Sequence, residues 1–237
     1  MMKAGVLAIG LCAASVPAQA QMAWTDKGFL AVDVGGQFGA KTFDTSSTFP
    51  LYEEDATLQT TQKGKSSPVL DIRGAYKVWG NNLLVGAGIS FASFKSDVAI
   101  NASIPDPAEF DQLRQVSLTA SDAKHSETQF HISATWMMPV TDKIDLGFSA
   151  GPTIFLLSKD VVSALSVTEP GPSADAVITD ESETSVGFHL GLDVQYMLNK
   201  RYGVGGLARY TWGSATVSSG DVTTGGFQIG GGLRVRF

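Results

Sequence analysis

Residues 223 to 237 alternate strictly between two kinds of side chain, and this pattern constrains the fold more than any other feature of the sequence. Successive side chains of a β-strand point to opposite faces, so alternate positions share one environment. The segment therefore predicts a strand that separates an apolar environment from a polar one. The apolar parity contains Phe227, Ile229, Gly231, Leu233, Val235 and Phe237, and the other parity contains Gln228, Gly230, Gly232, Arg234 and Arg236.

Seven earlier segments show the same alternation. They span residues 30–39, 70–77, 83–92, 129–138, 144–154, 186–198 and 202–212. The segment 144–154 is the least regular, because Pro152 lacks the amide donor of a sheet ladder and requires a bulge or a position above the membrane. Together the segments predict an all-β fold, an eight-stranded antiparallel up-and-down barrel.

Short and long connections alternate between these segments. Short turns rich in turn-forming residues are expected at residues 80–82, 141–143 and 199–201. Long loops are expected over residues 42–66, 98–125 and 159–183, with a smaller one at 218–222. This is the pattern of a transmembrane barrel, with the short turns periplasmic and the long loops outside.

Two of the long connections contain moderately apolar stretches, Ala102–Leu118 and Val161–Val167. A spanning strand needs only about 9 to 11 residues, so we expect these stretches to extend strands beyond the membrane as hairpins.

The polar parity distinguishes a transmembrane barrel from a water-soluble one. A soluble barrel would place many Lys and Glu side chains on its outer face, whereas here the polar parity is mostly Gly, Ser, Ala and Thr. Small side chains suit the narrow interior of an eight-stranded barrel. Aromatic residues of the apolar parity gather near both strand ends, as at membrane interfaces: Tyr76, Trp136, Tyr196, Tyr202 and Phe237 at the short rim, and Phe38, Phe91, Phe130, Tyr210 and Trp212 toward the long one.

Residues 1 to 20 have the features of a removed signal peptide: Lys3, an apolar stretch from Ala4 to Val16, and the small-residue cleavage site Ala18-Gln19-Ala20. We therefore expect the barrel domain to comprise residues 21 to 237. Cys12 would leave with the peptide, so no disulfide is expected. The remaining chain has 16 basic and 23 acidic residues, a balance that argues against nucleic-acid binding.

The terminal pattern resembles the OmpA/OmpX-like small outer-membrane β-barrels of Gram-negative bacteria. In that family a final Phe preceded by alternating apolar residues is the signal read by the barrel-assembly machinery, and the matching residues here are Phe227, Ile229, Leu233, Val235 and Phe237. The resemblance implies residence in the outer membrane. It also implies contact with outer-membrane lipid and lipopolysaccharide, handling by periplasmic chaperones, and a monomeric state.

Charged residues and histidines on the inward parity form the candidate functional site. They admit two interpretations: a polar path whose charges set selectivity, or a network of paired charges that plugs the barrel. We favour the plug because the barrel is narrow. The set comprises Asp33, Asp71, Arg73, Lys77, His131, Asp145, His189, Asp193, Arg209, Arg234 and Arg236.

Two functional classes follow from these interpretations. The first is a structural or surface-interaction barrel that acts through its long extracellular loops, and the alternative is a narrow porin-like channel or a conduit for small hydrophobic molecules. We expect no enzymatic activity, because His131 and His189 point inward and His125, Ser126 and Glu127 are adjacent in sequence without the alignment of a triad. Neither a cofactor nor a metal site is expected, because the histidines lack ligand spacing.

The expected extracellular connections are acidic. Residues 42–66, 98–125, 159–183 and 218–222 together carry 15 acidic and 5 basic side chains. Such a surface attracts cationic ligands, although polar loops also serve simply to keep an exposed surface solvated.

Deletion of Phe237 tests the terminal signal. We expect the shortened chain to assemble poorly, because the signal would be incomplete. The measurement is the difference in electrophoretic mobility between unheated and boiled samples in detergent, which a folded barrel shows. A shortened chain that reaches the membrane and shows the wild-type mobility difference would contradict the assignment.

Overall fold

The computed structural model describes residues 24–39, 42–63, 66–168, 173–217 and 220–237. The expected signal peptide, residues 1 to 20, lies outside these residues. The described residues contain no helix that is long and apolar enough to cross a bilayer. The strands in chain order are β1 (Gly28–Phe38), β2 (Thr42–Leu51), β3 (Glu54–Lys63), β4 (Ser67–Trp79), β5 (Leu83–Pro105), β6 (Leu113–Pro139), β7 (Ile144–Thr168), β8 (Ser173–Met197), β9 (Tyr202–Val217) and β10 (Gly220–Arg236).

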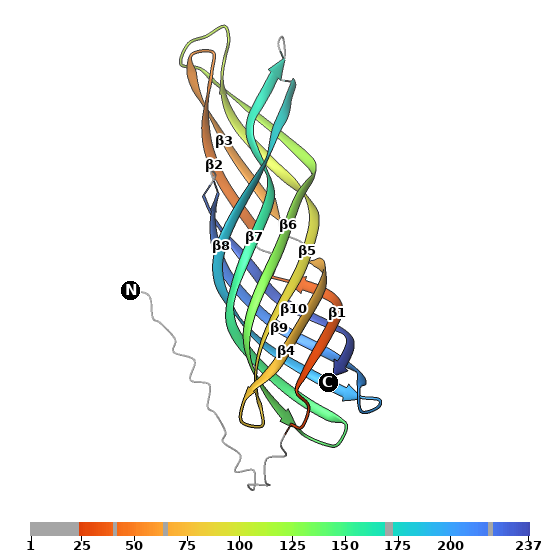
Figure 1. The fold of residues 1–237 in the computed structure, drawn as a ribbon. Coiled ribbons are helices and arrows are strands. Elements are labelled where there is room, and N and C mark those ends of the chain that lie inside the picture. Colours follow the sequence, from red (N-terminus) through yellow and green to blue (C-terminus); the bar gives the residue numbers. More distant parts are fainter. Residues whose placement is uncertain (1–23, 40–41, 64–65, 169–172, 218–219) are drawn as a thin grey trace, which may run out of the picture.

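Eight of these strands close into a ring, which confirms the predicted antiparallel barrel. β1 pairs with β10 on one side and with β4 on the other, and successive pairs from β4–β5 to β9–β10 complete the circle (Figure 1). At the closure, Gly28 N donates to Phe237 O at 3.0 Å and Phe237 N donates to Gly28 O at 3.1 Å. A closed ring satisfies the backbone groups that hydrocarbon cannot hydrogen-bond.

The two parities of the ring face opposite environments, as the sequence predicts. On β8, Leu190 and Val194 are 59% and 41% exposed on the outside. On the inside, Arg209 and Arg234 are 3% and 0% exposed. Apolar side chains therefore cover the outer surface of the ring, and charged side chains lie within it.

The short turns lie at one rim, at the positions that the sequence predicts. Val140 N donates to Ile144 O at 2.9 Å across the β6–β7 turn, and Leu198 N donates to Tyr202 O at 3.0 Å across the β8–β9 turn. The Asn199 side-chain oxygen accepts from the Arg201 and Tyr202 amides, both at 2.9 Å. These local hydrogen bonds favour tight turns.

Pro152 lies within β7, and the pairing of β7 is irregular beside it. The register of β6 with β7 runs from His125↔Lys159 to His131↔Thr153 and resumes at Ala134↔Ala150. The missing proline amide accounts for this interruption. The register does not shift there, and Pro152 pairs with Phe188 of β8 within the ring, so the expectation of a bulge or a position above the membrane is wrong.

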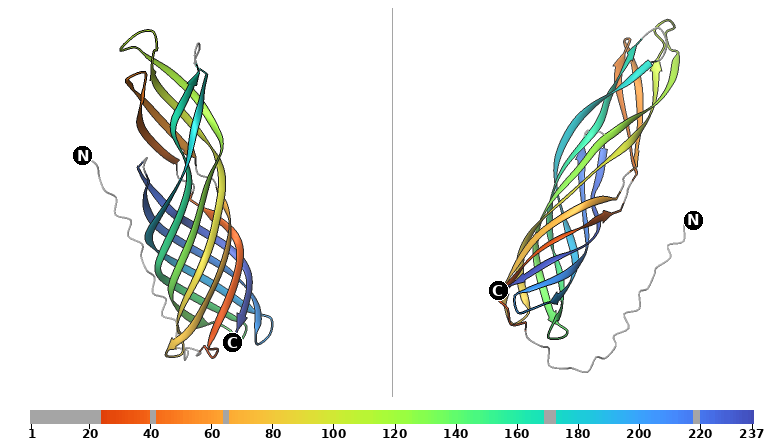
Figure 2. Two further views of the ribbon diagram at one scale, coloured as in Figure 1. Left: turned by 45° about the horizontal axis from the view of Figure 1, so that its top comes forward. Right: turned by 90° about the vertical axis from the view of Figure 1, so that its right-hand side faces the viewer.

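The expectation of a loop over residues 42–66 is wrong. β2 and β3 form a hairpin there, and β3 pairs with the upper part of β5, from Thr57↔Ser103 to Gln62↔Val98. The loops expected over 98–125 and 159–183 are also mostly strand, because β5 to β8 continue well past the ring. The predicted strand extensions in Ala102–Leu118 and Val161–Val167 are confirmed. We call the part formed by β2, β3 and the upper parts of β5 to β8 the extension (Figure 2).

The extension has its own apolar core. The face of β5 that carries Leu84, Ser90 and Ala92 into the ring continues upward with Val98 and Ile100, which are 3% and 1% exposed. The interior thus changes from small and polar to apolar. The clustered residues are Ala56, Leu58, Val98, Ile100, Ala102, Ile104, Val116, Ala120, Ala123, Val162 and Leu165. Because these residues come from β3, β5, β6 and β7, the core joins the β2–β3 hairpin to the upper strands.

This inversion follows from the solvent outside the ring. In a bilayer the apolar side chains face lipid and the polar ones turn inward. Strands that continue beyond a bilayer are surrounded by water, where burial of apolar area stabilises the inside instead. The extension consequently has the side-chain distribution of a water-soluble β-structure.

Truncation of Ile100 tests the stability of this core. We expect Ile100→Ala to destabilise the extension by about 2 to 5 kcal/mol, the usual cost of removing a buried aliphatic side chain. The lipid-embedded ring should still form. The measurement is the rate of proteolysis within residues 98–122 in folded protein, with Thr119→Ala as a control because Thr119 is exposed on the neighbouring strand. Equal proteolysis of both variants would contradict the result.

Candidate functional site

Two arginines and two aspartates join four strands at the centre of the ring. Arg234 donates to Asp33 at 2.8 Å and to Asp193 at 2.7 Å. Arg73 donates to Asp33 at 2.6 Å and also pairs with Asp193. Since these residues lie on β10, β1, β8 and β4, the ion pairs cross the interior of the ring.

Asp71 connects this cluster to a third arginine, Arg209. Its carboxylate accepts from Arg73 at 2.6 Å and from Arg209 at 2.7 Å. Ser90 donates to the same carboxylate at 2.6 Å. Every charged group in this part of the interior therefore has an oppositely charged partner, as buried charges require.

A chain of hydrogen bonds continues from Ser90 through both histidines. Ser90 Oγ lies 2.9 Å from His131 Nε2, and His131 Nδ1 lies 3.0 Å from Thr153 Oγ1. Thr153 Oγ1 in turn lies 2.9 Å from His189 Nδ1. All these side chains are buried, so the serine and the histidines take part in a packed network away from bulk solvent.

Amide side chains occupy the next level toward the extension. Gln228 donates to Gln37 at 2.9 Å and to Gln129 at 3.1 Å. Gln129 and the Gly225 amide donate to Glu127 at 3.0 and 3.2 Å. Gln37 also donates to Glu127 at 3.1 Å, and His125 Nε2 lies 3.1 Å from its other carboxylate oxygen, so the partners of this acid come from β1, β6 and β10.

Trp24 fills the opposite, short-turn end. Its indole nitrogen donates to Asp145 at 3.1 Å, and its carbonyl accepts from Lys77 at 2.9 Å. Arg236 pairs with Asp145 and lies over the indole ring. Apolar side chains surround this group, among them Phe29, Ala31, Ala75, Leu84 and Met137.

Glycines on the inward parity make room for the arginines. A Cβ atom at Gly205 would lie 2.7 Å from Arg234 Nε, and one at Gly88 would lie 2.8 Å from the Arg73 Cβ. The absence of side chains at these positions therefore admits the bulky guanidinium groups to a ring of only eight strands.

Small cavities lie among the inward side chains. A cavity between Arg73, Asp193 and Arg209 has a volume of about 20 Å³, which accommodates about one water molecule. At the base of the extension a cavity beside Gln62 and Lys159 has a volume of about 10 Å³. Two small cavities thus lie among the inward side chains, one within the ring and one at the base of the extension.

The sequence-derived residues occupy two separate places. Asp33, Asp71, Arg73, Asp193, Arg209 and Arg234 form the central cluster with His131 and His189 beside it, and Lys77, Asp145 and Arg236 lie with Trp24 at the short-turn end. The sequence reasoning missed Trp24, Thr153 and the role of Gln37, Gln129, Gln228 and Glu127. Their inward parity was a signal for the strand residues, whereas Trp24 precedes the first strand.

Metal binding has no candidate within the described residues, since they contain no group of three or more His, Cys, Asp or Glu side chains that could hold an ion.

Comparison with known proteins identifies a family. Residues 4–234 match the outer membrane protein beta-barrel domain family. No curated protein matches the chain.

Solved structures similar to this chain include three bacterial proteins. Neisserial surface protein A is 12% identical with a TM-score of 0.49, and the match covers 89% of this chain and 97% of that one. The attachment invasion locus protein of Yersinia pestis, in complex with the heparin analogue sucrose octasulfate, is 9% identical with a TM-score of 0.39 and coverages of 88% and 99%. The outer membrane protease OmpT from Escherichia coli is 10% identical with a TM-score of 0.44 and coverages of 90% and 97%.

Replacement of Arg234 tests the energetic role of the central cluster. We expect Arg234→Met to lower the free energy of unfolding by about 3 to 5 kcal/mol, because Asp33 and Asp193 would each lose a buried partner. The measurement is urea unfolding in lipid vesicles, followed by tryptophan fluorescence. The control is Lys95→Met, which breaks an exposed ion pair with Asp122 at 3.7 Å and should cost less than about 1 kcal/mol. Equal losses in the two variants would refute a special role for the cluster.

Proposed function

The chain belongs to the outer membrane protein beta-barrel domain family and resides in the Gram-negative outer membrane, and on this premise we propose that it is a closed, non-enzymatic barrel that presents the extension for surface interactions. The observation that supports the proposal is that ion-paired side chains cross the interior of the ring while the extension has an apolar core of its own. On this proposal the side chains inside the ring block a path for solutes, and the extension holds a structured surface outside the membrane.

The outer end of the extension brings two hairpin tips together. Thr57 of β3 pairs with Ser103 of β5, so the β2–β3 turn at residues 52–53 lies beside the β5–β6 turn at residues 106–112 (Figure 1). Exposed apolar side chains occur on both tips, with Phe110 76% and Tyr52 39% exposed. Exposed aromatic side chains of this kind favour protein contacts.

Acidic residues surround these aromatic side chains. Glu53 and Asp55 are exposed at the first tip, and Glu109 and Asp111 at the second. Tyr52, Glu53 and Asp111 have positive φ values of 53°, 64° and 61°, a conformation that costs non-glycine residues energy. An acidic surface with apolar anchors fits a partner that is cationic and carries apolar groups.

The proposal includes how the chain reaches the membrane. Residues 1 to 20 act as a removed signal peptide, and residues 21 to 237 form the mature barrel, which is a monomer. Periplasmic chaperones and the barrel-assembly machinery receive the chain through the outward face of β10, on which Phe227, Ile229, Leu233 and Phe237 are exposed and Val235 is half-buried. Lipopolysaccharide surrounds the outer half of the barrel.

Planar-bilayer recording tests whether the barrel is closed. We expect the reconstituted protein to give no unitary conductance steps, because paired charges and Trp24 fill the interior. Reproducible steps in the wild type that disappear or change in Asp33→Ala or Arg73→Ala would establish the channel alternative. Asp55→Ala, which lies outside the ring, is the control for such an effect.

Binding of polylysine-coated beads to cells that display the protein tests the tips. We expect binding that weakens with added salt and is largely lost in the combined variant Glu109→Gln, Phe110→Ser and Asp111→Asn, since both charge and anchor are removed. Asp97→Asn, an exposed acid away from the tips, should retain binding. If the tip variant binds as well as the wild type, the tips are not the interaction surface.

A further inference from the structure

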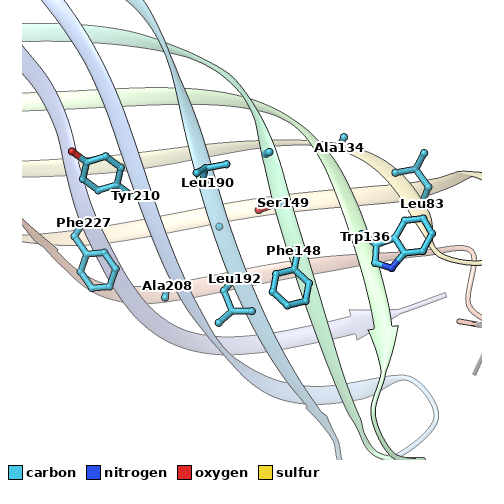
Figure 3. A pocket seen from close by; sticks show the side chains of 12 residues that line it. Leu83, Ala134, Trp136, Phe148, Ser149, Leu190, Leu192, Ala208, Tyr210 and Phe227 are labelled. Carbon is cyan, nitrogen blue, oxygen red and sulfur yellow. The ribbon is translucent and has the colours of Figure 1, made fainter. Parts of the chain in front are cut away.

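A groove crosses the outer surface of the ring in the region that faces lipid. It has a volume of about 630 Å³ and passes from β5 to β10. Leu83 and Trp136 lie at one end, Tyr210 and Phe227 lie at the other, and Leu190 lies between them (Figure 3). Its volume falls within the range of about 300 to 1,000 Å³ that is usual for small-molecule sites.

Two neighbouring rows of cross-strand pairs create the groove. In one row Ala134 pairs with Ala150, directly beside the large pair Trp136↔Phe148 of the next row. Farther along, Ala208 faces Leu192 in the register of β8 with β9. Small side chains beside aromatic ones therefore leave a trough, with the aromatic rings as walls.

The groove follows the hydrogen-bonding direction of the sheet, across the six strands from β5 to β10. Because the strands of such barrels tilt by about 35 to 45° from the membrane normal, the trough is inclined within the membrane. It extends from Trp136, near the short-turn rim, to Tyr210 and Phe227 near the other interface. The trough lies within the apolar belt and is continuous with the lipid-facing surface. We therefore expect its occupant to be a hydrocarbon chain.

The charges at the two rims indicate which membrane leaflet supplies the hydrocarbon chain. The turns that end the groove strands on the short rim carry Lys143, Lys200 and Arg201, all exposed, against one acid, Asp142. The sequence of the connections expected at the other rim, residues 42–66, 98–125, 159–183 and 218–222, is strongly acidic, with 15 acidic against 5 basic side chains. An anionic phosphate headgroup is therefore attracted to the short-turn rim and repelled at the other.

From these observations we infer that the groove binds one acyl chain of a phospholipid from the periplasmic leaflet, with its phosphate at the turns around Lys143 and Lys200. The site is distinct from the interior and from the tips, and it makes no use of the proposed surface interaction.

Native mass spectrometry of the detergent-purified protein, mixed with phosphatidylglycerol, tests the site. We expect one phospholipid to remain bound to the wild type. The combined variant Ala134→Leu and Ala150→Leu fills the trough and should lose it, as should Ala208→Leu. Ala87→Leu is the matched control, because Ala87 is exposed on β5 and does not line the groove. Mobility before and after boiling verifies that each variant is folded.

A second comparison, between two phospholipids, tests the headgroup assignment. We expect phosphatidylglycerol to be retained in preference to phosphatidylcholine, and this preference to disappear in Lys143→Gln, Lys200→Gln and Arg201→Gln. Equal phospholipid retention by the folded groove-filling variants and by Ala87→Leu would overturn the site. Preferential retention of lipopolysaccharide, or of a second copy of the chain, would overturn the choice of occupant.

Discussion

The structure depends on the absence of hydrogen-bonding solvent around the ring of eight strands. Backbone groups in hydrocarbon must pair within the protein, so the strands must close, and Gly28 and Phe237 complete the ring. Closing only eight strands leaves an interior that side chains fill. Charges placed there must neutralise one another, which explains why Asp33 and Asp193 are shared between Arg73 and Arg234.

Beyond the ring, the same strands bury apolar side chains on their inward face instead of polar ones. Along β5 the inward face passes from Ser90 to Ile100 without a break in the strand. Water outside the extension makes burial of apolar area favourable, and the β2–β3 hairpin covers part of that area. One continuous set of strands thereby forms a polar-centred barrel below and an apolar-centred structure above.

Lipid contact differs around the barrel because the outer face is not uniform. Large apolar side chains cover most of it, while Ala134, Ala150 and Ala208 leave a depression between aromatic walls. The basic short-turn rim and the acidic outer end give the molecule an electrostatic direction across the membrane. Membrane lipids of unlike charge therefore meet different surfaces at its two ends.

Alternation at period two is a local property of each segment, so the eight ring strands, their inward and outward faces and the short turns are predictable without the structure. It also placed Arg234 and Asp193 on the inward parity. Three features depend on the fold as a whole: the contact between these two side chains, the position of Trp24 at the short-turn end, and the pairing of residues 57–62 with β5. The hairpin escaped prediction because its polar, threonine-rich strands lack a strong apolar parity. In β6, Asp122, with φ of 62°, shifts the buried parity from odd residues such as Ala123 to even ones such as Ala120. Because the alternation restarts at this bulge, the parity of the residues on one side does not predict the parity on the other. Contacts between distant strands depend on the register that closure of the ring imposes.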